Sequence, residues 1–179
     1  MVKRFWGLVF FIAGLAIFSS AAQYGHANGL PLIEFPVKPL APAMQLQEYE
    51  GKAFNLETYR GRVVVVNFWA TWCSPCIREM PSIQKLSKLL SKESFAVLAL
   101  SQDIQGWSKI RPFIQKYQLN DLPIYNDPKL SGAKKFAVKG LPTTILLDRD
   151  GRELGRLLGH AEWDSKEAID LIKYHLSNY

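Results

Sequence analysis

At the centre of this 179-residue chain stands the stretch VVVVNFWATWCSPC, residues 63–76. The strand expected over Arg62–Phe68 contains four successive valines, which is typical of a strand buried on both faces of a sheet. From Pro75 to Ser91, apolar residues recur at the spacing of a helix. Because the chemistry of open α/β sheets lies where strands end, the two cysteines between these elements, Cys73 and Cys76, are the candidate reactive residues.

The spacing of the two cysteines favours reactivity over a structural role. A disulfide that closes so short a loop restrains the unfolded chain little and therefore contributes little stability. With Cys73 at the N-cap of the expected helix, Pro75 falls in the first turn, where its missing N–H costs nothing. The helix N-terminus would stabilise the Cys73 thiolate. We expect Cys73, the outer residue, to be the nucleophile and Cys76, the more buried one, to resolve the mixed disulfide.

Two structural alternatives remain open for this cysteine pair. One is half of a zinc site, for which the chain offers few partners. His160 and His175 are too far apart for the usual histidine pair, and His26 lies near the N-terminus. The other is an inert buried pair, against which the Trp-rich lead-in and the helix-capping position both count. We therefore predict no metal site and no cofactor.

The first 27 residues have the layout of a secretory signal. Basic Met1–Arg4 precedes the apolar run Phe5–Phe18, and small residues with cleavage patterns ending at Ala22 or Ala27 follow. The apolar run is shorter than the ~20 residues of a spanning helix, which favours a cleaved signal peptide over a signal anchor. Either form would export the domain, so we expect a periplasmic protein that contacts the membrane only if the leader is uncleaved.

Strand and helix patterns alternate through the rest of the chain. After a Pro-rich lead-in over residues 28–42, residues 43–179 are expected to form one domain. The expected strands are Met44–Gln47, Ala53–Leu56, Phe95–Leu100, Leu122–Tyr125, Thr143–Leu147 and Glu153–Leu158, and the further helices are Trp107–Tyr117, Leu130–Phe136 and Trp163–Leu176. This order predicts an α/β fold, with a mixed sheet sandwiched by helices and an N-terminal β-hairpin extension.

Composition and charge exclude two classes of protein. With 48% hydrophobic and 21% charged residues, the chain is expected to form a packed core rather than remain disordered. The formal net charge is +6, and Lys3 and Arg4 of the leader supply two of those charges. No run of Lys or Arg is present, so we expect no nucleic-acid partner.

From about Ala43 to Leu176 the chain resembles the thioredoxin superfamily, and within it the TlpA/ResA-like (DsbE/CcmG-like) periplasmic thiol:disulfide oxidoreductases. Residues 68–76, FWATWCSPC, are similar to the active-site signature of that family, and residues 140–144, GLPTT, are similar to its cis-proline loop. Two separate motifs in the right order make the resemblance specific, where one Cys-x-x-Cys would be weak.

The resemblance implies how a substrate would be held. Pro142 would be cis, and the backbone of Leu141 would pair with an extended substrate segment. A trans proline at the start of a strand is the alternative for Pro142. Trp69 and Trp72 would form an apolar rim around the sulfurs, although core packing is an equal alternative for Trp69.

The resemblance also points to two acids beside the cysteines. Cytoplasmic thioredoxins carry a buried Asp where this chain has Asn67, whereas the TlpA/ResA-like pattern places an acid after the next strand, matched here by Asp103. We expect Asp103 to manage the proton of Cys76, with a solvated helix cap as the alternative. Glu79 matches the Glu of the family's Cys-x-x-Glu-x-Pro extension. If buried, Glu79 would raise thiol pKa values; its alternative is a surface position on the helix.

The direction of electron flow follows from the residues between the cysteines. Ser74-Pro75 contains no cation that would stabilise the thiolate and make the protein oxidising. With the resemblance, this favours a reductant of periplasmic disulfide-bearing proteins, apocytochrome c among them. Because the periplasm is kept oxidising, a transmembrane thiol reductase of the DsbD/CcdA type is implied as electron donor.

Two rival functions use the same cysteines. A peroxidase of the related peroxiredoxin type needs a Thr-x-x-Cys sequence, and Thr71-Trp72-Cys73 is one residue too short. The non-enzymatic rival is a binding or assembly module that holds copper(I) on the two soft thiolates of Cys73 and Cys76.

Overall fold

The structure, a computed structural model, describes residue 30, residues 32–49 and residues 51–178. The leader and its expected cleavage sites lie outside these residues. The described strands form one eight-stranded mixed sheet in the order β1-β8-β7-β4-β5-β6-β2-β3. The strands are β1 (Leu32–Glu34), β2 (Gln45–Gln47), β3 (Ala53–Asn55), β4 (Val63–Trp69), β5 (Phe95–Ser101), β6 (Ile124–Asn126), β7 (Thr143–Leu147) and β8 (Glu153–Leu158).

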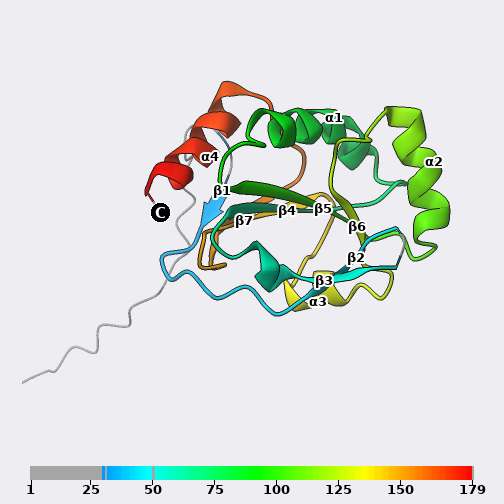
Figure 1. Ribbon diagram of the computed structural model, residues 1–179, viewed down its shortest axis with the longest axis horizontal. Coiled ribbons are helices and arrows are strands. Elements are labelled where there is room, and N and C mark those ends of the chain that lie inside the picture. The colour runs from blue at the N-terminus through cyan, green and yellow to red at the C-terminus, as the bar shows by residue number, and fades with distance from the viewer. Residues whose placement is uncertain (1–29, 31, 50, 179) are drawn as a thin grey trace, which may run out of the picture.

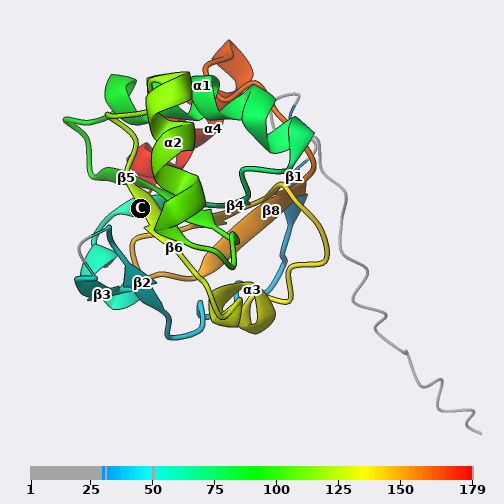
Figure 2. The same ribbon diagram turned by 90° about the vertical axis from the view of Figure 1, so that its right-hand side faces the viewer.

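Helices cover both faces of this sheet (Figures 1 and 2). α1 (Ser74–Leu89), α2 (Trp107–Tyr117) and α4 (Lys166–Asn178) lie on one face, and α3 (Ser131–Lys135) lies on the other. A 3-10 turn, η1 (Leu56–Tyr59), adds Leu56 to the core on the α3 side. The predicted α/β fold, a mixed sheet sandwiched by helices with an N-terminal hairpin of β2 and β3, is confirmed.

The position of β4 at the centre of the sheet accounts for its run of valines. All seven of its residues are buried, because successive side chains alternate between the two cores. Val63, Val65 and Trp69 face the core under α1, while Val64, Val66 and Phe68 face the core on the α3 side. β4 pairs in parallel with β5 and antiparallel with β7, so its carboxyl end meets the start of β7.

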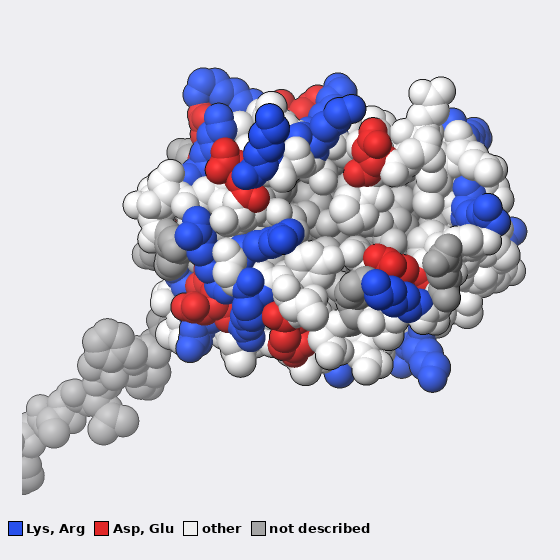
Figure 3. Space-filling model, viewed as in Figure 1, with Lys and Arg blue, Asp and Glu red and all other residues white. Residues whose placement is uncertain are grey.

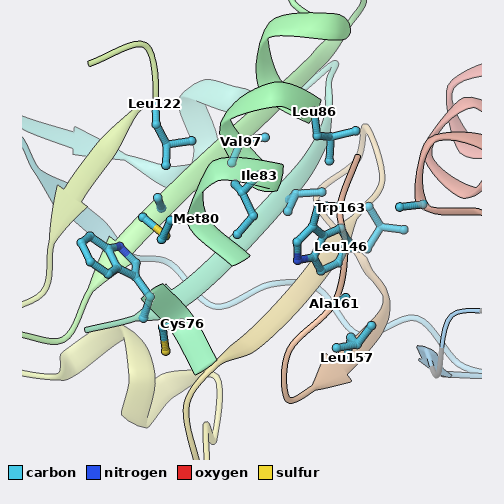
Figure 4. Packing of buried hydrophobic residues seen from close by; sticks show 14 of the residues in the cluster. Cys76, Met80, Ile83, Leu86, Val97, Leu122, Leu146, Leu157, Ala161 and Trp163 are labelled. Atoms are coloured by element: carbon cyan, nitrogen blue, oxygen red, sulfur yellow. The ribbon is translucent and has the colours of Figure 1, made fainter. Parts of the chain in front are cut away.

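Helix α1 is fastened to the sheet by one apolar stripe. Cys76, Met80, Ile83 and Leu86, spaced three or four apart, are all fully buried and pack in the cluster that includes Val97 (Figure 4). Residues at this spacing share one face of a helix. Cys76 is the first member of that stripe, so the position of its sulfur is set by the packing of the whole helix.

Most predicted elements differ from the observed ones by no more than one or two residues at an end, but β1 was not predicted and α4 begins three residues later than expected. Within the Pro-rich lead-in, β1 pairs antiparallel with β8, with Leu32 opposite Leu157. The strand is only three residues long, too short for its alternation to stand out among prolines. α4 begins at Lys166 rather than Trp163, because the N–H of Trp163 donates to the Ser82 hydroxyl and its side chain is buried in the core.

Candidate active site

The two cysteines lie where β4 gives way to α1. Cys73 is the N-cap of α1, and a proline occupies the first turn, which confirms the predicted local geometry. The two sulfurs are joined in a disulfide of 2.06 Å, and the Cys76 N–H donates to the Cys73 sulfur at 3.3 Å. Cys73 is 5% exposed and Cys76 is fully buried. A partner therefore reaches the sulfur of Cys73 first.

A second loop lies at the same edge of the sheet. The Leu141–Pro142 peptide bond is cis, as expected, and leads directly into β7. Phe68 near the end of β4 pairs with Thr143 at the start of β7, which brings the proline loop beside the segment that carries the cysteines. The carbonyl of Pro142 accepts from the Gly159 N–H at 2.9 Å, so this loop is also tied to the residue that follows β8.

The two tryptophans before the cysteines have different roles. Trp72 is 70% exposed and is free to contact a partner. Trp69 is fully buried and packs on Phe113 of α2, with ring centroids 5.1 Å apart. The expectation that Trp69 forms part of an apolar rim is therefore wrong. As the last residue of β4, it shares the face of Val65 and must point into the core.

Glu79 lies one helical turn beyond Cys76 and is fully buried, which excludes the surface alternative. Its Oε1 accepts from Asn67 Nδ2 at 2.9 Å, and its Oε2 accepts from the Ala161 N–H at 3.2 Å. Burial raises the pKa of Glu79 from 4.5 to about 7, because desolvation of the charged form outweighs these hydrogen bonds, which lower it. A carboxyl group that titrates near neutrality can both take up and release a proton there.

The partners of Glu79 were missed by sequence reasoning. Asn67 Nδ2 also donates to the Thr144 hydroxyl at 2.9 Å, so this amide links β4, α1 and β7. The available signal was one polar residue inside a strand of otherwise apolar residues, since a buried polar group needs a hydrogen-bond partner. Ala161 acts through its backbone and left no signal in the sequence.

The raised pKa of Glu79 makes the stability of the fold depend on pH. The folded protein holds the Glu79 proton more tightly than the unfolded chain does, so this contribution is fully present below about pH 4.5 and is lost as the pH rises through about 7. A shift of this size corresponds to about 3–4 kcal/mol. We expect Glu79→Gln to lack this loss. Urea unfolding at about pH 5 and pH 8, values that bracket neutrality, measures how much the free energy of unfolding falls in the wild type and in the variant. An equal fall in both proteins would contradict the prediction.

Asp103 is buried as well, just beyond β5. Its Oδ2 accepts from the Thr71 N–H at 3.0 Å and from the Ser101 hydroxyl at 2.7 Å, and its Oδ1 accepts from the Thr71 hydroxyl at 2.7 Å. The alternative of a solvated helix cap is wrong, because the side chain is only 3% exposed and α2 begins later, at Trp107. These bonds tie the end of β5 to the loop that presents Trp72 and Cys73.

A groove of about 550 Å³ opens beside this loop. Three segments form it: the turn after β4, the residues that follow β5 into α2, and the stretch from α3 to the proline loop. Its lining residues are Thr71, Trp72, Gln102, Asp103, Ile104, Gln105, Lys109, Leu130, Ala133, Val138, Lys139, Gly140 and Leu141. The groove therefore reaches from the residue before Cys73 to the residue before Pro142.

Among the described residues, no group of three or more His, Cys, Asp or Glu side chains is placed to hold a metal ion. No helix in the same part of the chain is long and apolar enough to cross a membrane.

A cystine at a helix N-terminus, beside a cis-proline loop on a thioredoxin-like sheet, defines the class of thiol-disulfide oxidoreductases. The chain belongs to the AhpC/TSA family, whose model matches residues 37–152. It is similar to the thiol-disulfide oxidoreductase ResA of Geobacillus thermodenitrificans, with 33% identity over 134 residues, 74% of this chain and 76% of the relative. ResA of Halalkalibacterium halodurans is 30% identical over 179 residues, 96% of both chains.

Solved structures agree with these relatives. A Chlorobium tepidum protein described as a thiol:disulfide interchange protein DsbE superposes with a TM-score of 0.71 at 27% identity, covering 78% of this chain and 96% of that one. StoA from Bacillus subtilis has a TM-score of 0.62 at 21% identity, covering 75% and 97%, which bears on the fold alone. The protein is thus an enzyme, a thiol-disulfide oxidoreductase with a thioredoxin-like fold that acts on disulfide-bearing substrates.

Proposed function

We propose that the protein reduces disulfides of exported proteins through Cys73 and Cys76. The observation that carries the proposal is the N-cap position of Cys73, whose sulfur lies at the positive end of α1. That position favours the thiolate, which is the attacking form. Ser74 and Pro75 between the cysteines add no cation that would make the protein strongly oxidising.

The reaction has two steps, and its electrons balance. The Cys73 thiolate attacks one sulfur of the substrate disulfide, so that a bond from Cys73 to the substrate forms, the substrate S–S bond breaks, and the leaving sulfur takes a proton. Cys76 then loses its proton and attacks the Cys73 sulfur, which closes the Cys73–Cys76 disulfide and releases the second substrate thiol. The substrate gains two electrons and two protons, and the protein loses them.

The second step needs an acceptor for the proton of Cys76. Asp103 and Glu79 are the candidates. The oxygens of Asp103 already accept three hydrogen bonds from Thr71 and Ser101, which supports a positioning role for Asp103. Glu79 lies one turn from Cys76 on α1, and its pKa is raised to about 7, which supports Glu79 as the proton acceptor.

The substrate segment would be held by Trp72, Leu141 and Pro142. Leu141 is half-buried and lines the groove, and its backbone is the proposed partner for an extended segment carrying the disulfide. The exposed ring of Trp72 would cover the apolar part of that segment.

The proposed compartment is the periplasm, with residues 1–27 as signal peptide or anchor. The expected division into a lead-in over 28–42 and a redox domain over 43–179 is corrected in one respect, because β1 within the lead-in is part of the sheet of the redox domain. Apocytochrome c is the proposed example of a substrate, and a DsbD/CcdA-like transmembrane thiol reductase is the proposed electron donor.

Mass spectrometry of the native protein should find an N-terminus within residues 22–28, as expected for a cleaved signal peptide. Full-length protein in the membrane fraction would establish the anchor instead.

A copper(I)-binding module is the alternative from a different functional class, and insulin reduction distinguishes the two. With dithiothreitol as electron source, the protein should accelerate insulin reduction, and the reduced protein titrated with copper(I) should retain little metal after exchange against a chelator. Tight copper retention without turnover would favour the binding module. A peroxidase is disfavoured by the position of Thr71, one residue too close to Cys73.

A further inference from the structure

We propose that the groove beside Cys73 selects cystine-bearing segments in which an acidic residue stands next to an apolar one. This inference rests on the proposed reduction of protein disulfides and names the substrate class of that same site. Three features of the groove support it: two lysines at its rim, one acid in its floor, and two exposed apolar side chains.

The rim of the groove carries two positive charges without partners. Lys109 belongs to the first turn of α2, and Lys139 stands two residues before Leu141. Both side chains are exposed. Within the part of the chain that the structure describes, neither ammonium group has an ion-pair or hydrogen-bond partner. A carboxylate in the groove would therefore gain from both lysines without first breaking an existing contact.

Among the described residues one acid, Asp103, lines the groove, and it does not neutralise these lysines. Asp103 is 3% exposed, and both of its carboxylate oxygens accept hydrogen bonds from Thr71 or Ser101. It forms no ion pair with either rim lysine in this part of the chain. The rim is therefore positive although the floor contains a carboxylate.

The net charge of the chain also favours acidic substrates. The formal net charge is +6, and it stays positive when Lys3 and Arg4 of the proposed leader are left out; on the face drawn in Figure 3 basic side chains outweigh acidic ones. A positive surface attracts acidic partners at long range and repels basic ones. Long-range attraction and local charges in the groove thus favour the same substrates.

Apolar surface completes the recognition site. Trp72 is 70% exposed and Ile104 is 73% exposed, and both line the groove together with Leu141. Exposed apolar side chains of this size gain free energy when a partner covers them. A substrate with an apolar residue beside its acidic residue would cover them while its carboxylate stays at the lysine rim.

The test uses three synthetic peptides, each with one intramolecular disulfide and otherwise identical sequences. Beside the second cysteine they carry Asp-Leu, Lys-Leu or Asp-Gly. The second-order rate constant for reduction by the reduced protein is measured at low salt. Two charge contacts at the surface predict about a tenfold preference for Asp-Leu over Lys-Leu. That preference should shrink in high salt, and Asp-Gly should react more slowly than Asp-Leu.

Charge variants locate the effect. Lys109→Gln/Lys139→Gln should abolish the preference, and Lys109→Glu/Lys139→Glu should reverse it. The matched control is Lys92→Glu/Lys173→Glu, which makes the same change in net charge at two exposed lysines outside the groove lining and should keep the preference. Lys92 precedes β5 and Lys173 lies on α4.

The other possible outcomes separately reject the acidic specificity, the apolar specificity or the proposed function. Equal rate constants for Asp-Leu and Lys-Leu, or a control variant that shifts the preference as much as the groove variants do, would reject the acidic specificity while leaving disulfide reduction intact. Equal rates for Asp-Leu and Asp-Gly would reject the apolar half of the proposal. Failure to reduce any of the peptides, and insulin as well, would reject the proposed function itself.

Discussion

Replacing Cys73 by serine is expected to abolish the reduction of insulin. A serine hydroxyl is not ionised near neutral pH and cannot displace a sulfur, whereas the Cys73 thiolate is favoured by the N-terminus of α1. Cys76→Ser should still attack, because the outer sulfur remains, but it cannot resolve the product. That variant should accumulate mixed disulfides with its substrates, visible on a non-reducing gel and reversed by dithiothreitol.

The control for this experiment is the double variant, Cys73→Ser/Cys76→Ser, which should capture nothing. Alkylation of the reduced protein as a function of pH tests the same assignment without a substrate. Cys73 should be the faster thiol and should titrate below the ~8.5 of a free cysteine. Faster alkylation of Cys76 would mean that the two roles are exchanged.

Local patterns in the sequence were sufficient to predict the elements that position these sulfurs. Four valines in succession identified β4, and a helical period with proline in its first turn identified α1 with Cys73 as its cap. Both signals depend on residues close together in the chain. β7 was predicted with its observed bounds, Thr143–Leu147, for the same reason.

Features that depend on distant segments were not predictable in this way. The burial of Glu79 is set by α1 packing against β4 and by the backbone of Ala161, which is 82 positions away in sequence. β1 forms only because β8 offers an edge for it to pair with. The groove is assembled from three separate segments, so its lysine rim could not be seen in any one stretch of sequence.

Trp69 shows how one register position decides between two roles. The family resemblance suggested that both tryptophans form a rim around the sulfurs, with core packing as an equal alternative for Trp69. β4 continues through Trp69, and alternation along a strand then directs its side chain to the same face as Val65, into the core. Trp72 lies beyond the end of the strand and escapes that constraint, which leaves it 70% exposed.

Glu79→Gln is expected to slow release of the mixed disulfide by on the order of a hundredfold near neutral pH, as for loss of a general base. Cys76 is buried and resists ionising, so its attack on Cys73 depends on a nearby base. With a pKa raised to about 7, Glu79 is ionised above neutrality, and the wild-type release rate should rise as the pH passes through that value. The variant should lack this rise and recover only at higher pH, where hydroxide deprotonates Cys76.

Asp103→Asn is the matched comparison, because it also removes one carboxylate and keeps the side-chain shape. Its three accepted hydrogen bonds hold Thr71 and Ser101, so the change should disturb the loop before Cys73 and slow attack and release alike, with the pH profile of release unaltered. Stopped-flow reduction of a model disulfide, followed by Trp72 fluorescence, separates the two steps. If Asp103→Asn instead removes the pH-dependent rise in the release rate and Glu79→Gln retains that rise, then Asp103 is the proton acceptor of Cys76 and the role of Glu79 is structural.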